Sequence, residues 1–148
     1  YQGVGKSVDN LEVKKVIASW AGFKRQRVSC WAEYLGKDTR IIYQHGSKKT
    51  YLYPDRSYIF RISYVPDNVK KILISGTRFP EYRLFSVMYD IDAKRCFELI
   101  ADGNVAYKCA FDGNDLYYTH RLGEGFDDRV IKKAKYLKYI ETDLVTLM

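Results

Sequence analysis

The chain has 148 residues, a formal net charge of +7 and 47% hydrophobic residues. This length suits one domain with a sizeable core, and no apolar run approaches the roughly eighteen residues that a membrane-spanning helix needs. Only 3 Pro and 10 Gly argue against a disordered chain, whereas 14 Tyr favour β-rich structure with amphipathic side chains on its surfaces.

The positive charge favours acidic partners such as nucleic acid or anionic glycans. Lysine pairs are spread along the chain, however, and an even spread is also typical of an ordinary solvated surface. These pairs are Lys14-Lys15, Lys48-Lys49, Lys70-Lys71 and Lys132-Lys133.

The three cysteines are Cys30, Cys96 and Cys109. They lack the CxxC spacing of a zinc site, and any disulfide scheme leaves one of them unpaired. We therefore expect buried thiols, and the sequence predicts neither a metal site nor a cofactor.

Strands are predicted over residues 13–23 and 28–35 and again from residue 40, because these segments contain β-branched and aromatic residues between polar turns. A further strand is predicted over residues 57–64, after a Pro-Asp turn. It alternates between two faces, as a half-buried antiparallel strand does, and the alternation places Ile59 and Arg61 on the same face.

Residues 69–100 resemble residues 13–44 at a constant offset of 56 positions. The identical pairs include Lys70 with Lys14 and Phe79 with Phe23, and several apolar positions are also matched. Both segments keep the order strand, turn, strand, turn, strand, which a duplicated supersecondary unit preserves.

A third copy is predicted to begin at the Asp-Gly-Asn turn over residues 102–104. Comparison with the earlier copies predicts a strand over residues 129–137, although the apolar residues near this end of the chain also fall at helical spacing. We expect a strand, because the repeat spans more of the chain than the short periodicity does. The predicted units are residues 13–46, 57–100 and 104–140.

A unit of about four strands that recurs every 45 to 56 residues resembles a β-propeller blade. The resemblance depends on two segments, Tyr89-Asp90-Ile91-Asp92-Ala93-Lys94 and the residues from Phe111 to Tyr118. The second segment is more similar to sialidase-like and five-bladed glycosidase propellers than to WD repeats, although the Ser-x-Asp-x-Gly-x-x-Trp box of sialidases is missing. The resemblance implies an all-β fold of repeated antiparallel four-stranded units, with a β-sandwich as the alternative.

Two or three blades cannot close a ring, because at least four usually pack around a channel. The chain would then be an open fragment or would complete a ring with other chains. Open sheet edges expose unpaired backbone groups, so we expect self-association or binding of a partner chain.

Propeller glycosidases use paired carboxylates, one protonated and one ionised. The resemblance therefore makes Glu124, Asp127 and Asp128 the candidate catalytic residues, in a loop near His120 and Arg121. A Gly-flanked acidic loop is also the composition of a simple solvated turn.

The candidate ligand-binding residues are Trp20, Arg78, His120 and Arg121. Arg78 and Arg121 follow matching strands and could pair with a carboxylated sugar, although a repeated arginine also suits a salt bridge between blades. Trp20 corresponds to Gly76 at the 56-residue offset, so the repeated unit does not need a large side chain there.

Three classes of function follow from these observations. The first is a non-catalytic recognition module that binds a glycan or a protein through an aromatic and basic rim. The second is a glycosidase-like propeller enzyme, or a fragment of one. The third is a nucleic-acid-binding β-domain, whose affinity would fall steeply as salt rises.

Overall fold

The computed structural model describes residues 22–36, 38–120 and 127–147, and every regular element in them is a β-strand. The prediction of an all-β fold of antiparallel strands is therefore confirmed for this part of the chain. Its residues include no helix of the length and apolarity that crossing a membrane would require. The strands are β1 (Gly22–Arg25), β2 (Val28–Leu35), β3 (Asp38–His45), β4 (Lys48–Tyr53), β5 (Ser57–Val65), β6 (Asn68–Arg78), β7 (Arg83–Asp90), β8 (Arg95–Ala101), β9 (Asn104–Val105), β10 (Tyr107–Asp112), β11 (Asp115–His120), β12 (Asp127–Lys133), β13 (Leu137–Thr142) and β14 (Thr146–Leu147).

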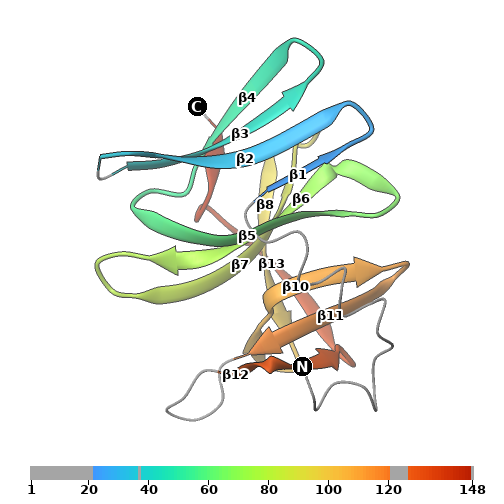
Figure 1. The fold of residues 1–148 in the computed structure, drawn as a ribbon. Coiled ribbons are helices and arrows are strands. Elements are labelled where there is room, and N and C mark those ends of the chain that lie inside the picture. Colours follow the sequence, from blue (N-terminus) through green and yellow to red (C-terminus); the bar gives the residue numbers. More distant parts are fainter. Residues whose placement is uncertain (1–21, 37, 121–126, 148) are drawn as a thin grey trace.

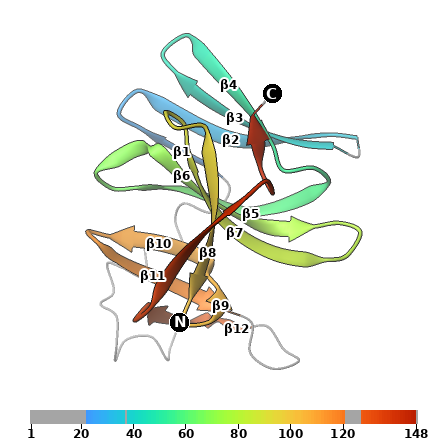
Figure 2. The same ribbon diagram turned by 180° about the vertical axis from the view of Figure 1, so that it is seen from behind.

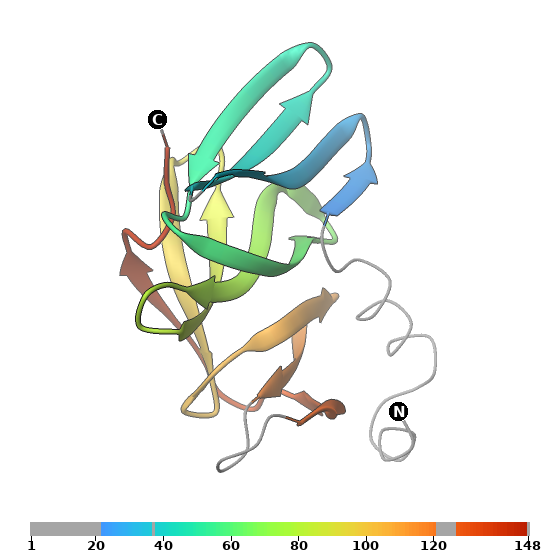
Figure 3. The same cartoon turned by 60° about the vertical axis from the view of Figure 1, so that its left-hand side comes forward.

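The strands form three antiparallel sheets (Figure 1). Sheet A has the order β1-β2-β3-β4-β14, and sheet C has the order β10-β11-β12. Sheet B has the order β13-β8-β7-β6-β5, with β9 also paired to β8. Sheet A lies on one side of sheet B and sheet C on the other, as Figure 3 shows from a different direction.

Sheet B is covered on both faces because its central strands are apolar on both sides. Successive side chains of a strand point to opposite faces, and in β6 Ile72 and Ile74 pack toward sheet A while Leu73 packs toward sheet C. Such a continuous apolar run is typical of a strand with no solvated face. Two separate hydrophobic clusters therefore hold the three sheets together.

The larger cluster lies between sheets A and B and includes Leu144 and Val145, near the end of the described chain. Its buried members are Val28, Cys30, Ile41, Tyr43, Leu52, Ile59, Ile62, Val69, Ile72, Ile74, Phe85, Val87, Tyr89, Cys96, Leu144 and Val145. The smaller cluster joins sheets B and C, and its buried members are Leu73, Leu99, Ala101, Ala106, Cys109, Leu116 and Tyr118.

A chain of buried polar groups crosses the interface between sheets B and C. Arg61, Ser75 and Ser86 are cross-strand partners on β5, β6 and β7, and Arg61 is only 2% exposed. The Arg61 Nε donates to the backbone carbonyl of Cys109 at 2.9 Å. The hydroxyls of Ser75 and Ser86 lie 2.7 Å apart, and Ser86 Oγ lies 3.3 Å from Cys109 Sγ. Two of these bonds attach β10 of sheet C to β5 and β7 of sheet B, and the third joins β6 to β7 within sheet B.

The predicted alternation of β5 is wrong at one point. The pairing with β6 shifts between Ile59 and Arg61, as at a β-bulge, and such an extra residue moves later side chains to the other face. Ile59 and Ile62 consequently belong to the cluster with sheet A, whereas Arg61 points to sheet C. Next to this bulge, a Cβ on Gly76 would lie 2.5 Å from the carbonyl oxygen of Tyr58, so β5 and β6 approach too closely for a side chain there.

Residues 129–137 form strand structure, as predicted, and not the alternative helix. A bend divides this segment between β12 and β13. The carboxylate of Asp102 accepts hydrogen bonds from the amides of Lys135 and Tyr136, and the Asp102 amide donates to the Tyr136 carbonyl. After this bend, β13 pairs with β8 of sheet B and β14 with β4 of sheet A (Figure 2). The end of the described chain therefore leaves sheet C and extends the other two sheets.

All three cysteines are buried and free, as the sequence predicts. Burial raises the pKa of Cys96 to about 12 and also raises the pKa of Cys30 and Cys109. At pH 8 a thiol with that pKa is ionised in roughly one molecule in ten thousand, and only the thiolate reacts with disulfide or alkylating reagents. We expect Ellman's reagent to label none of the three promptly in the native protein and all of them in guanidinium chloride. Prompt labelling of a native thiol would contradict this burial.

Candidate functional site

Several residues predicted to bind or react lie outside the described residues, namely Trp20, Arg121 and Glu124. The backbone pairing of β11 with β12 places His120 opposite Asp127, with Asp128 next along β12. The structure therefore brings the backbones of His120 and Asp127 together across two strands of sheet C.

Arg78 is fully described and makes two ion pairs at the end of β6. Its Nη2 lies 2.7 Å from Asp55 Oδ2, and its Nε lies 3.8 Å from Glu81 Oε1. Asp55 belongs to the connection between β4 and β5, which carries the chain from sheet A to sheet B. Arg78 is thus ion-paired, but Asp55 lies between two predicted units and Glu81 in the same unit as Arg78, so neither ion pair joins two predicted blades.

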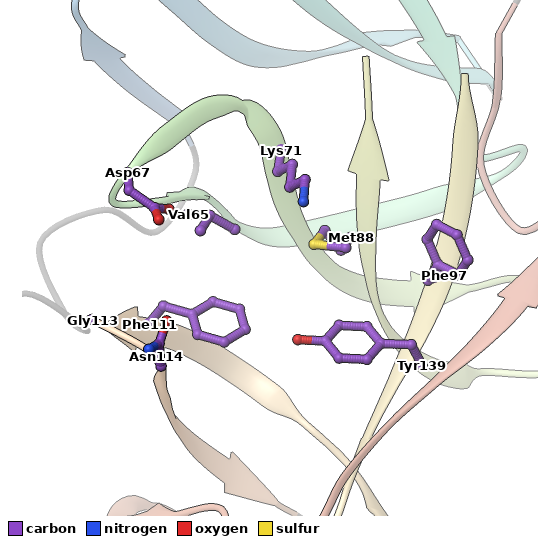
Figure 4. Close-up of a pocket in the computed structure, with 9 residues that line it drawn as sticks. All are labelled: Val65, Asp67, Lys71, Met88, Phe97, Phe111, Gly113, Asn114 and Tyr139. Atoms are coloured by element: carbon purple, nitrogen blue, oxygen red, sulfur yellow. The ribbon is translucent and has the colours of Figure 1, made fainter. Parts of the chain in front are cut away.

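A hollow of about 470 Å³ lies between sheet B and the β10–β11 hairpin (Figure 4). We call it the aromatic groove. Its lining residues come from six strands and two turns, which brings together parts of the chain that are far apart in sequence. They are Val65, Asp67, Lys71, Met88, Phe97, Phe111, Gly113, Asn114 and Tyr139.

Three aromatic rings define the walls of the groove. The rings of Phe111 and Tyr139 point toward each other across the hollow in Figure 4. Phe97 pairs directly with Met88 across β8 and β7, so both side chains lie on the face of sheet B that is turned to sheet C. The guanidinium carbon of Arg95 lies 5.1 Å from the centre of the Phe97 ring, within the range of a cation–π contact. Arg95 is not among the lining residues and its guanidinium is paired with the Glu141 carboxylate, so this contact holds the Phe97 ring without adding a free cation to the groove.

Tyr139 reaches the groove only because β13 joins sheet B instead of continuing sheet C. It pairs with Leu99 of β8 and remains 46% exposed. Partial burial raises the pKa of its phenol, so the hydroxyl stays protonated at neutral pH and can both donate and accept hydrogen bonds.

Polar groups stand at the rim of the groove. Asp67 lies in the turn between β5 and β6, Lys71 on β6, and Asn114 in the β10–β11 turn. A carboxylate, an ammonium and an amide together can bind hydroxyls as donors and as acceptors. The groove can therefore hold a ligand that has an apolar face and a polar edge.

The described lining of the groove offers one carboxylate, that of Asp67. Glycoside hydrolysis normally requires two carboxylates about 5 to 9.5 Å apart in one cleft. In the described ranges, no group of three or more His, Cys, Asp or Glu side chains is placed to hold a metal ion. The described lining of the groove therefore offers contacts for binding a ligand.

Two further hollows contain several lysines. The larger, about 940 Å³, lies beside the bend at residues 134–136; we call it the lysine hollow. It is lined by Asp102, Gly103, Asn104, Tyr118, Ile131, Lys132, Lys133, Lys135, Tyr136 and Lys138. The smaller, about 400 Å³, includes Lys48, Lys49 and Lys94.

Asp102 organises the lysine hollow. Besides the two backbone amides of the bend, its carboxylate accepts a hydrogen bond of 2.9 Å from the Tyr118 hydroxyl. The bond from the Tyr136 amide, with those from Tyr118 and Lys135, lowers the pKa of Asp102. Burial, together with the bond to Asp102, raises the pKa of Tyr118 to about 12. Asp102 is therefore an ionised carboxylate whose oxygens are occupied by donors from the protein.

Sequence reasoning did not identify the groove residues as a site. The signals available were the Asp-Gly-Asn-Asp turn after Phe111 and the excess of tyrosine, and neither shows that Tyr139 reaches Phe111. The position of Tyr139 across the hollow from Phe111 depends on the bend after β12, which the repeat did not predict. Comparisons with protein-family models, with curated proteins and with solved structures find no match for the chain.

Proposed function

We propose that the chain is a non-catalytic recognition module that binds a glycan in the aromatic groove. The observation that carries the proposal is the joint presence of three aromatic rings and three polar rim groups around one hollow of about 470 Å³. This volume lies within the range of about 300–1,000 Å³ typical of small-ligand sites. A sugar presents C–H faces that pack on aromatic rings and hydroxyls that bind polar side chains, and the groove offers partners for both.

The size of the groove favours a glycan over a protein partner. A stable protein interface usually buries more than about 1,000 Å² and requires a broad surface. The aromatic groove instead concentrates its rings around a hollow that a few sugar units could fill. A protein ligand thus becomes an outcome that the experiment below can detect.

We also propose that the three sheets are propeller-like repeated units. In support, β2–β3 and β7–β8 share one register at the 56-residue offset, since Glu33 pairs with Arg40 as Tyr89 pairs with Cys96. The packing faces also correspond. Cys30 of β2 faces sheet B, and its counterpart Ser86 of β7 faces sheet C. Each unit thus turns an equivalent face to the next one, as blades do, whereas a symmetric sandwich would bring equivalent faces together.

Association with a second copy or a partner chain is part of the same proposal. Three units arranged in this way leave sheet A and sheet C each with one outer face that no described sheet covers. A ring of blades would cover such faces with further blades.

A glycan array followed by titration calorimetry on the best ligand tests the proposed groove. We expect Phe111→Ala and Tyr139→Ala each to weaken binding about tenfold or more, because each removes a wall against which the sugar packs. Tyr136→Ala is the matched control, since it removes another exposed tyrosine, outside the groove, and should leave sugar affinity unchanged. Melting temperatures of all variants separate lost binding from lost folding.

Other outcomes contradict specific parts of the proposal. If sugar binds and neither groove variant weakens it, the site is elsewhere. If a peptide library gives ligands and the array gives none, the partner is a protein. If a bound glycan is hydrolysed, the module is an enzyme and the proposed lack of catalysis is wrong.

A further inference from the structure

The lysine hollow contains four lysines that come from one short segment, residues 132–138. Lys132 and Lys133 lie on β12, Lys135 in the bend and Lys138 on β13, and all four line one hollow of about 940 Å³. The bend makes this possible, because it turns β13 back from sheet C to sheet B (Figure 2). Lysines brought together around a concave surface create a local positive potential larger than scattered lysines do.

Three of these lysines have their charge available. Lys133 Nζ lies 3.2 Å from Asp115 Oδ2 and forms an ion pair. Lys132, Lys135 and Lys138 are exposed, and none of them forms an ion pair within residues 22–36, 38–120 and 127–147. An anionic ligand could contact them without first displacing a described acidic partner.

The carboxylate in the hollow offsets only part of this charge, because Asp102 interacts electrostatically with Lys135 but forms no ion pair with the lysine side chains of the hollow in the described ranges. Asp102 directs its oxygens to the Tyr118 hydroxyl and to the amides of Lys135 and Tyr136. These bonds fix the bend and thereby the positions from which Lys135 and Tyr136 extend. Asp102 thus acts as a support for the two residues beside it.

Tyr136 adds a flat aromatic surface to the cations. It is 76% exposed and directly follows Lys135 in the bend. Proteins that bind single-stranded nucleic acid combine a positively charged surface that follows the phosphates with aromatic rings on which bases stack. A nucleobase has a flat π-face that can stack on such a ring, whereas a sulfated sugar offers the ring only C–H groups.

We propose that the lysine hollow is a binding site for single-stranded nucleic acid, with Lys132, Lys135 and Lys138 on the phosphates and Tyr136 stacked on a base. This site is separate from the aromatic groove and independent of the function proposed for it. The two share no lining residue. Failure of either proposal therefore leaves the other intact.

Fluorescence anisotropy with a labelled oligothymidylate, measured over a series of salt concentrations, tests the three lysines. Each phosphate contact on a single strand contributes about 0.7 to the slope of log affinity against log salt. The variant Lys132→Gln/Lys135→Gln/Lys138→Gln should therefore bind more weakly at low salt and reduce the slope by about 2. Lys48→Gln/Lys49→Gln/Lys94→Gln makes the same change in net charge at the smaller hollow and should keep the slope of the unaltered protein.

Tyr136 is tested in the same assay. Tyr136→Ala should lower affinity about 5- to 150-fold while leaving the salt slope unchanged, because stacking does not release counterions. Tyr136→Phe keeps the ring and should bind as well as the unaltered protein. The proposal is overturned if the oligonucleotide does not bind at low salt, if both triple variants reduce the slope equally, or if only a sulfated glycan binds the hollow.

Discussion

Arg61→Ala is expected to lower the free energy of unfolding by about 3–5 kcal/mol, the largest effect we expect from a single substitution. The side chain is almost completely buried between sheets B and C. Its removal leaves a cavity, and it deprives the Cys109 carbonyl of the donor that holds β10 against sheet B. Both losses occur at the same place, so sheet C should separate from sheet B more readily. Urea unfolding followed by circular dichroism measures the change.

Arg61→Met separates the two causes of this loss. Methionine fills much of the arginine volume but provides no donor, so the remaining cost should include that of the unsatisfied Cys109 carbonyl, about 1–3 kcal/mol. A buried charge can also cost more than its bonds contribute, and replacing it by an apolar residue then stabilises the protein. If Arg61→Met unfolds at a higher urea concentration than the unaltered protein, the polar contacts of Arg61 do not stabilise the junction of the two sheets.

Gly76→Ala is expected to destabilise the protein by about 1–3 kcal/mol, and Gly76→Val by more. The added Cβ would lie 2.5 Å from the Tyr58 carbonyl oxygen and 3.1 Å from Phe85 Cζ. The first of these atoms belongs to the backbone of β5, so the strand itself must move. The expected loss of stability comes from steric overlap and not from backbone conformation, since Gly76 is not among the glycines with positive φ. The midpoint of urea unfolding reports it.

Gly46→Asn is the control for Gly76. Gly46 has a φ of +63°, and nothing lies within 4 Å of a Cβ added there. Asparagine tolerates this left-handed conformation better than most residues, so the variant should remain within about 1 kcal/mol of the unaltered protein. Equal stability of Gly76→Ala and the unaltered protein would mean that β5 and β6 are not as close as the structure places them.

Local patterns predicted the strands well because most of them are held by short-range contacts. The polar turns and apolar runs anticipate β2, β5 and β7, and the repeat anticipates a strand after residue 129. They failed at Arg61, since alternation assumes unbroken pairing and the bulge in β5 interrupts it. No periodicity in the chain distinguishes a buried arginine bound to a distant carbonyl from a solvated one.

The candidate sites could not be predicted because they are made where distant segments meet. Phe111 and Tyr139 share a groove only after β13 has paired with β8. The four lysines are neighbours in the sequence, but their hollow also needs Asp102 and Tyr118, which are distant from them along the chain. Asp102 itself looks like an ordinary turn residue in the sequence. Its role depends on the amides of Lys135 and Tyr136, more than thirty positions away.

The path of β13 and β14 also has a consequence for the order in which the protein folds. Hairpins such as β2–β3 and β7–β8 join neighbouring segments and can close quickly, because little chain entropy is lost. Thr146 instead pairs with Tyr53, and Leu144 and Val145 complete the cluster between sheets A and B. Among the described strand pairings, that of β14 with β4 closes the longest loop. The contacts of Leu144 and Val145 stabilise the protein fully only when sheets A and B have both formed. We therefore expect the junction of sheets A and B to be completed late in folding, after the hairpins have formed.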